Sequence, residues 1–185
     1  MTPRRTPRRP DVSTVEIVGG AEPLEVALHE PDPRWPERFG RHRDRIRAVL
    51  PHVGVEHIGS TSVPGLAAKP VVDVLVTVDD ITAEEDYLGQ LLAAGYVLRV
   101  REPGHRLVRT PARDVHVHVY ERDAPAVGEY LLLRDHLRAD AADRRLYEDT
   151  KRALMTRRWT DTNDYADAKT EVITAIKDRA RAALR

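Results

Sequence analysis

The sequence predicts an α+β fold in which a small mixed sheet precedes a layer of helices at the carboxyl end. Short apolar runs rich in valine, separated by turn residues, fill the first part of the 185-residue chain. The stretch Asp114–Tyr120 (DVHVHVY) alternates with a period of two, which is typical of a strand with one buried face. From Val127 onward the apolar spacing becomes helical.

The elements follow in order along the chain. Glycine and proline break the apolar runs of Val15–Leu28, which predicts an edge strand or lead-in. Pro36 suits the first turn of a helix ending near Pro51, with an apolar face made of Trp35, Phe39, Ile46 and Leu50. The remaining expected elements are strands at Val53–Ile58 and Val71–Val78, a helix at Thr82–Ala94, a hairpin of Tyr96–Arg101 with Arg106–Thr110, and helices over 126–139, 142–157 and 162–183, the last capped by Asp161 or Thr162.

Composition excludes several classes of protein. The formal net charge is 0, so no general basic field and no clear nucleic-acid surface are expected. The chain has no cysteine, which excludes disulfides, thiolate zinc sites and a cysteine nucleophile. The apolar runs are too short to cross a membrane, and the basic amino end lacks the apolar segment of a secretory signal. A cytoplasmic protein without a membrane partner is expected.

The domain organisation expected from the sequence is simple. Residues 1–12 repeat Thr-Pro-Arg-Arg, a composition that cannot build a core and predicts a disordered basic arm. Residues 13–185 would then form one domain, with a sheet-containing core over about 24–124 and a helical part over about 125–185.

The stretch 55–76 (VEHIGSTSVPGLAAKPVVDVLV) combines a loop suited to phosphate with a strand that carries one carboxylate. Gly59 and Ser60 directly follow a strand, where backbone amides and a hydroxyl can approach a phosphate. The next residues leave room for a turn, so Asp73 is expected on a strand beside this loop. A carboxylate in an apolar strand is costly unless it is paired, hydrogen-bonded or bound to a metal. The same residues also fit a tight turn with an Asp73 that caps a backbone amide.

Two histidines on a later strand are candidates for the same site. His116 and His118 are two residues apart and so face the same side of a strand. With Asp73 on a neighbouring strand they would suit Zn²⁺, Mn²⁺ or Fe²⁺, or act as a general base and as donors to phosphate. In the alternative interpretation, one histidine is a core residue bonded to a carbonyl and the other lies near solvent.

The helical half supplies cations. Lys151 lies four residues after Tyr147, and Lys169 four after Tyr165, so each pair shares a helix face. Directed at the Gly-Ser loop, Lys151, Lys169 and Arg134 would form a phosphate-binding wall. Surface salt bridges are the alternative for each of them, because the chain has 30 basic residues.

The motif at 57–76 resembles the GrpB-like family, a branch of the nucleotidyltransferase-fold superfamily. The likeness extends over about residues 24–183, in the same order. The segments that carry it are PRWPERF (33–39), VHVHV (115–119), LLLRDHLRAD (131–140), LYEDTKRAL (146–154) and DYADAKTEVI (164–173).

The resemblance implies part of a transferase site. Transferases of this superfamily use a Gly-Ser loop for triphosphate and an Asp-x-Asp or Asp-x-Glu pair for divalent metals. Asp73 matches the first acid, whereas Leu75 stands where the second is expected. One aspartate can help to hold one Mg²⁺ but is poorly suited to two. The expected catalytic and metal-binding residues are Asp73, His116 and His118. Mg²⁺ or Mn²⁺ is favoured as the metal over Zn²⁺ or Fe²⁺. The expected phosphate contacts are Gly59, Ser60, Thr61, Lys69, Arg134, Lys151 and Lys169.

Three functions remain open at this point. The first is transfer of a nucleotidyl or related group, with a nucleotide or phosphorylated small molecule as the ligand. The second is a binding or chaperone-like module that has lost this chemistry, as suggested by the similar domain attached to dephospho-coenzyme A kinase in some bacteria. The third is a hydrolase or ligase that uses a metal held by the histidine pair. The residues give no signal of oligomeric state.

Overall fold

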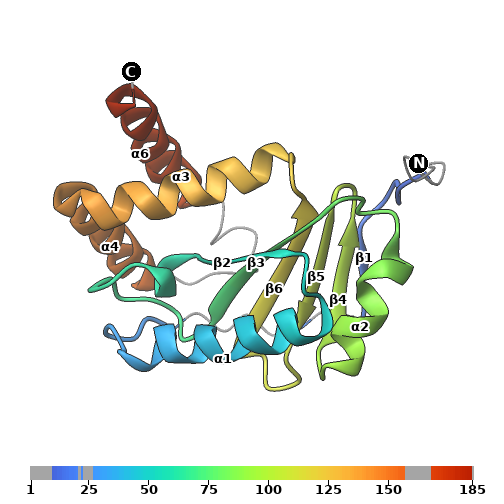
Figure 1. Cartoon of the computed structure of the whole chain (residues 1–185). Helices are drawn as coiled ribbons and strands as arrows, with labels where there is room; N and C mark the ends of the chain where they lie inside the picture. Colours follow the sequence, from blue (N-terminus) through green and yellow to red (C-terminus); the bar gives the residue numbers. More distant parts are fainter. Residues whose placement is uncertain (1–9, 21, 23–26, 157–167, 185) are drawn as a thin grey trace.

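One six-stranded sheet with helices on both faces forms the molecule (Figure 1). The computed structural model describes residues 10–20, 22, 27–156 and 168–184. The strand order is β1-β4-β5-β6-β3-β2, with β3 and β6 parallel and every other neighbouring pair antiparallel. The predicted α+β class with a mixed sheet is therefore confirmed. The strands are β1 (Glu16–Ile17), β2 (Gly54–Ile58), β3 (Val72–Val78), β4 (Val97–Glu102), β5 (His105–Arg109) and β6 (Val115–Glu121).

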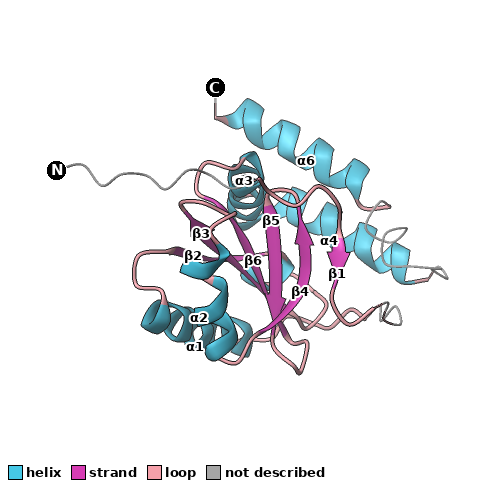
Figure 2. Cartoon of the chain, turned by 90° about the vertical axis from the view of Figure 1, so that its right-hand side faces the viewer, coloured by secondary structure: helices cyan, strands magenta, loops and turns pink. Residues whose placement is uncertain are grey.

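Helices α1 (Arg34–Val49) and α2 (Leu88–Ala93) cover one face of the sheet (Figures 1 and 2). The valines at alternate positions of β3 and β6 point to this face and are buried, as the period of a strand requires. They pack against apolar side chains of the two helices, including Trp35, Ile46 and Leu91. This layer is the main hydrophobic core, and on the opposite face β3 and β6 carry Asp73, His116 and His118 together with the apolar Leu75.

The helical layer at the carboxyl end consists of α3 (Pro125–Ala139), α4 (Ala141–Met155) and α6 (Thr170–Ala183) and lies on the other side (Figure 2). Asp140 caps α4, because its side chain accepts a hydrogen bond from the backbone N–H of Asp143. A second cluster of buried apolar residues joins these helices to the segment after β2: Val63, Leu66, Leu137, Tyr147 and Ile176. Among the described residues, no helix is long and apolar enough to cross a bilayer.

Two helices differ from the sequence prediction. The helix expected over Thr82–Ala94 is divided into a 3₁₀ turn, η2 (Glu84–Asp86), and the short α2. Tyr87 separates them with φ −144°, because its buried hydroxyl donates to the carbonyl of Ile81. The last helix, expected from residue 162, begins at Thr170, and the proposed caps at 161 and 162 lie outside the described residues.

The amino-terminal segment is attached to the sheet at Asp11. Its carboxylate accepts hydrogen bonds from Arg106 at 2.5 Å and from the backbone N–H of Gly104 at 2.6 Å. Asp11 therefore belongs to the packed structure, although it falls within the arm expected to be disordered. Residues 1–9 of that arm lie outside the described residues.

Candidate functional site

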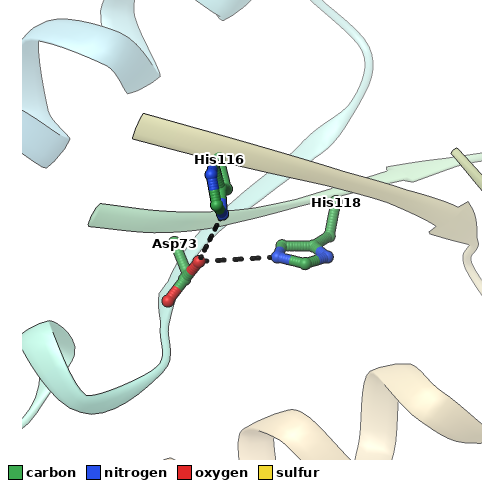
Figure 3. Close-up of side chains that lie close together, drawn as sticks. All are labelled: Asp73, His116 and His118. Carbon is green, nitrogen blue, oxygen red and sulfur yellow. Dashed lines mark ion pairs between the residues drawn. The ribbon is translucent and has the colours of Figure 1, made fainter. Parts of the chain in front are cut away.

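Asp73, His116 and His118 converge at one end of the β3–β6 pair (Figure 3). The Oδ1 atom of Asp73 lies 3.5 Å from Nε2 of His118 and 3.7 Å from Nδ1 of His116. Strand pairing accounts for this arrangement, because Asp73 is paired with His116 across the parallel ladder and the alternation of side chains places His118 on the same face. The three side chains are partly exposed, so the group is open to a ligand.

The separations in this group suit a shared cation. Ligand atoms lie about 2.0–2.2 Å from an ion such as Zn²⁺, so two ligands of one tetrahedral ion are about 3.4 Å apart. The 3.5 Å and 3.7 Å separations approach this value and are long for direct hydrogen bonds. Two imidazole nitrogens and one carboxylate oxygen suit Mn²⁺, Fe²⁺ or Zn²⁺, whereas Mg²⁺ prefers oxygen alone. The residues present therefore fit one divalent cation.

Leu75 leaves no place for a second acid in this group. It lies on the same face as Asp73, two residues further along β3, and is paired with His118 and Glu56 on the neighbouring strands. The Leu75 side chain is fully buried. An apolar side chain with no contact to solvent occupies the position where a second carboxylate would face the cation.

Gly59 holds the Gly-Ser loop against Asp73. It follows β2 with φ 70° and ψ −177°, a conformation that is essentially restricted to glycine. A Cβ atom placed on Gly59 would lie 2.5 Å from Oδ2 of Asp73. The loop continues as a 3₁₀ turn, η1 (Ser60–Ser62). The sequence prediction that Asp73 lies on the strand beside this loop agrees with the structure.

Lys151 of α4 holds this loop from the other side. Its ammonium donates to the hydroxyl of Ser60 at 3.2 Å and to the carbonyl of Ala67, and it lies 4.8 Å from the ring centroid of Tyr147. The Lys151 side chain is 3% exposed. Burial lowers its pKa to about 7, although the nearby Glu148 carboxylate raises it. In this structure Lys151 therefore positions the loop that carries Ser60.

We expect this lysine to give a pH-dependent contribution to stability. Between pH of about 7 and its ordinary pKa of 10.5, the unfolded chain binds a proton at Lys151 that the folded chain does not. The free energy of unfolding therefore rises with pH across this window. We expect the wild type to gain free energy of unfolding relative to Lys151→Met as the pH rises from about 7 to about 10. Urea titrations of both proteins at several pH values measure this change.

Arg122→Met serves as the matched control, because an exposed guanidinium stays charged throughout this range and Arg122 pairs with Asp79, at the other end of β3 from the Gly-Ser loop. The difference in free energy of unfolding between this control and the wild type should not change with pH. If the difference for Lys151→Met is equally independent of pH, the lowered pKa of the buried Lys151 is wrong.

The other three predicted phosphate-binding cations differ in what they lie near. Burial lowers the pKa of Lys169, and the neighbouring Asp73 carboxylate partly offsets the effect. Lys69 is exposed and also acts electrostatically on Lys169. Arg134 is directed elsewhere: it donates to Glu56 at 2.7 Å, to the carbonyl of His57 at 3.2 Å and to Asp135. Lys169 and Lys69 thus contribute positive charge near Asp73 and His116, whereas Arg134 braces the end of β2.

Thr61 of the loop and His57 of β2 pack against one another. The Thr61 hydroxyl lies 3.1 Å from Nε2 of His57, whose ring stacks on Phe39. Burial lowers the pKa of His57 to about 4. Thr61, predicted as a phosphate contact, is itself buried, and its hydroxyl contacts His57. Both side chains stabilise the loop from within.

Sequence reasoning missed two residues of this site. Arg138 donates to the carbonyl of Ser62 at 2.8 and 3.0 Å, and its position four residues after Arg134 on the same helix was an available signal. His105 was also missed: its Nε2 lies 3.1 Å from Nδ1 of His118. Burial lowers the pKa of His105 to about 4.

A second histidine–aspartate cluster has a structural role. Asp143 accepts from Arg179 and lies 2.6 Å from Nε2 of His136, and Asp140 caps the same turn of α4. These bonds tie α3, α4 and α6 together at the start of α4.

Residues 25–179 match the family described as GrpB protein. The chain belongs to the GrpB family. Along 96% of its length it is 70% identical to a UPF0157 protein of Streptomyces coelicolor, of which it covers 96%. A crystal structure of the conserved protein GrpB from Enterococcus faecalis superimposes with a TM-score of 0.73 at 30% identity, covering 83% of this chain and 96% of that one.

Two further comparisons reach beyond the GrpB proteins. This GrpB-family chain is 31% identical to a dephospho-CoA kinase of Mycolicibacterium paratuberculosis over 78% of its own length, but it covers only 43% of that protein. The structure of the GLD-2/RNP-8 complex aligns with a TM-score of 0.51 at 15% identity, over 78% of this chain and 59% of that one. The latter likeness shows the fold alone. The fold is nucleotidyltransferase-like, as the sequence resemblance implied.

Proposed function

We propose that this GrpB-family protein binds a nucleotide by its phosphates together with one divalent cation, preferably Mn²⁺. The observation that carries the proposal is the convergence of Asp73 with His116 and His118 beside the Gly-Ser loop. These three side chains would hold the cation. When bound, it would neutralise phosphate charge and polarise the phosphorus–oxygen bonds.

The chain's own residues supply the remaining contacts. The loop of Gly59 and Ser60 offers a hydroxyl and closely approachable backbone to a phosphate. Lys169 and Lys69 add positive charge on the side of Asp73. Lys151 fixes the hydroxyl of Ser60 in place. Together they support a site for a di- or triphosphate rather than for an uncharged ligand.

A nucleotidyl transfer step can be written with the residues of this site. The oxygen of an acceptor hydroxyl attacks the α-phosphorus, the bond from that phosphorus to its bridging oxygen breaks, and pyrophosphate leaves. Burial lowers the pKa of His116, although Asp73 raises it. A neutral ring is thereby favoured, which leaves His116 a lone pair for the cation, and the proton of the acceptor hydroxyl passes to solvent. Leu75 restricts the site to one cation, so we expect transfer to be slow compared with that of enzymes with two metals.

The alternative is a binding module without catalysis. The similarity to part of a longer dephospho-CoA kinase favours it, because this family's domain there accompanies additional chain. The two functions share the same ligand site and differ only in turnover.

The test is a thermal-shift series with Mn²⁺, Mg²⁺ or Zn²⁺ and each of four nucleoside triphosphates, on the wild type and on Asp73→Asn. At about 100 times the dissociation constant, binding stabilises by about 2.7 kcal/mol, which raises Tm by about 5–10 °C for a chain of this size. We expect this shift in the wild type and its loss in Asp73→Asn. Release of pyrophosphate from the shifted combination then separates transfer from binding.

Asp79→Asn is the matched control, since Asp79 follows the other end of β3 and its side chain is 86% exposed. It should keep the full shift. Absence of a shift in the wild type with every combination would overturn the proposal.

A further inference from the structure

We propose that Glu102 and His105 position His118, by fixing the tautomer that presents the bare Nε2 atom of His118 to the cation. This inference rests on the metal site proposed above. It adds to that site two residues from the β4–β5 hairpin, which is separate in sequence from the Gly-Ser loop and from β3. Their role follows from a chain of hydrogen-bonding atoms that begins at a carboxylate.

The chain of contacts determines where the protons lie. Oε1 of Glu102 lies 2.5 Å from Nδ1 of His105, and a carboxylate can only accept, so this nitrogen carries a proton. In its neutral form the buried His105 ring, with this proton on Nδ1, has none on Nε2. That nitrogen lies 3.1 Å from Nδ1 of His118 and accepts a hydrogen bond from it. His118 is therefore protonated at Nδ1, and when neutral it has a lone pair on Nε2.

This lone pair faces the carboxylate of Asp73. Nε2 of His118 and Oδ1 of Asp73 are 3.5 Å apart, and neither atom has a proton to share in this tautomer. Two lone pairs that face one another repel, unless a cation lies between them. The arrangement is the one in which a metal-binding histidine donates its other nitrogen to a neighbouring group, which orients the ring and raises its basicity.

Packing keeps the rings in this orientation. The ring of His105 stacks on Tyr120 with centroids 4.4 Å apart and an interplanar angle of 12°. It is also parallel to the ring of His118 within 10°, at 5.2 Å. The strand pairing explains the stack, because His105 is paired with Tyr120 across the β5–β6 ladder. With both neighbours fixed, rotation of the His105 ring would break the hydrogen bonds at both of its nitrogens.

Glu102→Gln and His105→Gln test the inference by two measurements. The first is the affinity for Mn²⁺ alone, by isothermal titration calorimetry, where we expect a loss of about 10–100-fold in each variant. The second is the tautomer of His118, from ¹⁵N chemical shifts of the metal-free protein. The wild type should show the Nδ1–H form, and both variants should show a mixture with the Nε2–H form.

His52→Gln, a change of an exposed histidine at the far end of the sheet, is the control and should alter neither measurement. If the wild type binds Mn²⁺ and both variants keep its affinity, the positioning role is wrong. A wild-type His118 protonated at Nε2 would also overturn it, even in a protein that binds no metal. Failure to bind Mn²⁺ with the Nδ1–H tautomer in place would instead contradict the metal site of the proposed function.

Discussion

Replacing Gly59 with alanine is expected to destabilise the protein by about 2–5 kcal/mol and to remove its binding of Mn²⁺. The backbone at Gly59 has a conformation that other residues rarely adopt, and the added methyl would lie 2.5 Å from the carboxylate of Asp73. Either the loop or the Asp73 side chain must move, and both are needed for the site. Urea unfolding measures the stability, and titration with Mn²⁺ measures the binding.

Gly65→Ala is the matched control for this substitution. Gly65 lies in the same segment with φ +75°, but a Cβ atom there would have no neighbour within 4 Å. Only the cost of the positive φ, about 1–2 kcal/mol, should appear, with unchanged binding of Mn²⁺. If Gly59→Ala and Gly65→Ala behave alike in both measurements, the close approach of loop and strand does not constrain the site.

Replacing Arg106 with methionine is expected to cost about 3–5 kcal/mol, which is typical for breaking a buried ion pair. Arg106 is 2% exposed. Its guanidinium donates to Glu84 at 2.6 Å, to Asp11 at 2.5 Å and to the carbonyls of Glu102 and His105. The methionine would leave the carboxylates of Glu84 and Asp11 and two carbonyls without this donor. The measurement is the midpoint of urea unfolding, with the m-value as a check on two-state behaviour.

Arg101 provides the comparison for Arg106, because it also binds Glu84 but lies at the surface. It donates to Glu84 and Glu16, and its side chain is 27% exposed. Arg101→Met should therefore cost only about 1 kcal/mol or less. Equal costs for the two substitutions would show that burial of the Arg106 guanidinium adds nothing.

The central part of the site could be predicted because it depends on the period of a strand. Two histidines at alternate positions must share a face, and the Gly-Ser loop followed by an apolar strand brings Asp73 back beside Gly59. The mixed sheet and the helical layer followed from the same periodicities and from the family resemblance. These features are local in the sequence, or they are set by neighbouring strands.

The directions of long side chains could not be predicted in the same way. Arg134 and Lys151 were both predicted to contact phosphate; in the structure Arg134 donates to Glu56, and Lys151 donates to Ser60 and to the carbonyl of Ala67. Their targets lie on segments far away in the sequence, and a flexible side chain reaches whichever acceptor the packing places nearby. His105 could not be predicted either, because its contact with His118 depends on the register of β5 against β6.

The split of the helix expected over Thr82–Ala94 has a different origin. The apolar period continues through Tyr87, so pattern alone favours one helix. Burial of the Tyr87 ring and the bond from its hydroxyl to Ile81 fix a non-helical backbone at that point. Tertiary packing here overrides a local preference.

The parallel pairing of β3 with β6 also affects the order in which the molecule can assemble. Residues 79–114 lie between these strands, so their pairing closes a long loop, which costs more chain entropy than the neighbouring hairpins do. The hairpin of β4 and β5 brings together residues that are close in sequence. Asp73 and the two histidines meet only when β3 joins the unit that contains β6. A folding intermediate with hairpins alone would therefore lack the site, and recovery of Mn²⁺ binding during refolding would report on completion of the sheet.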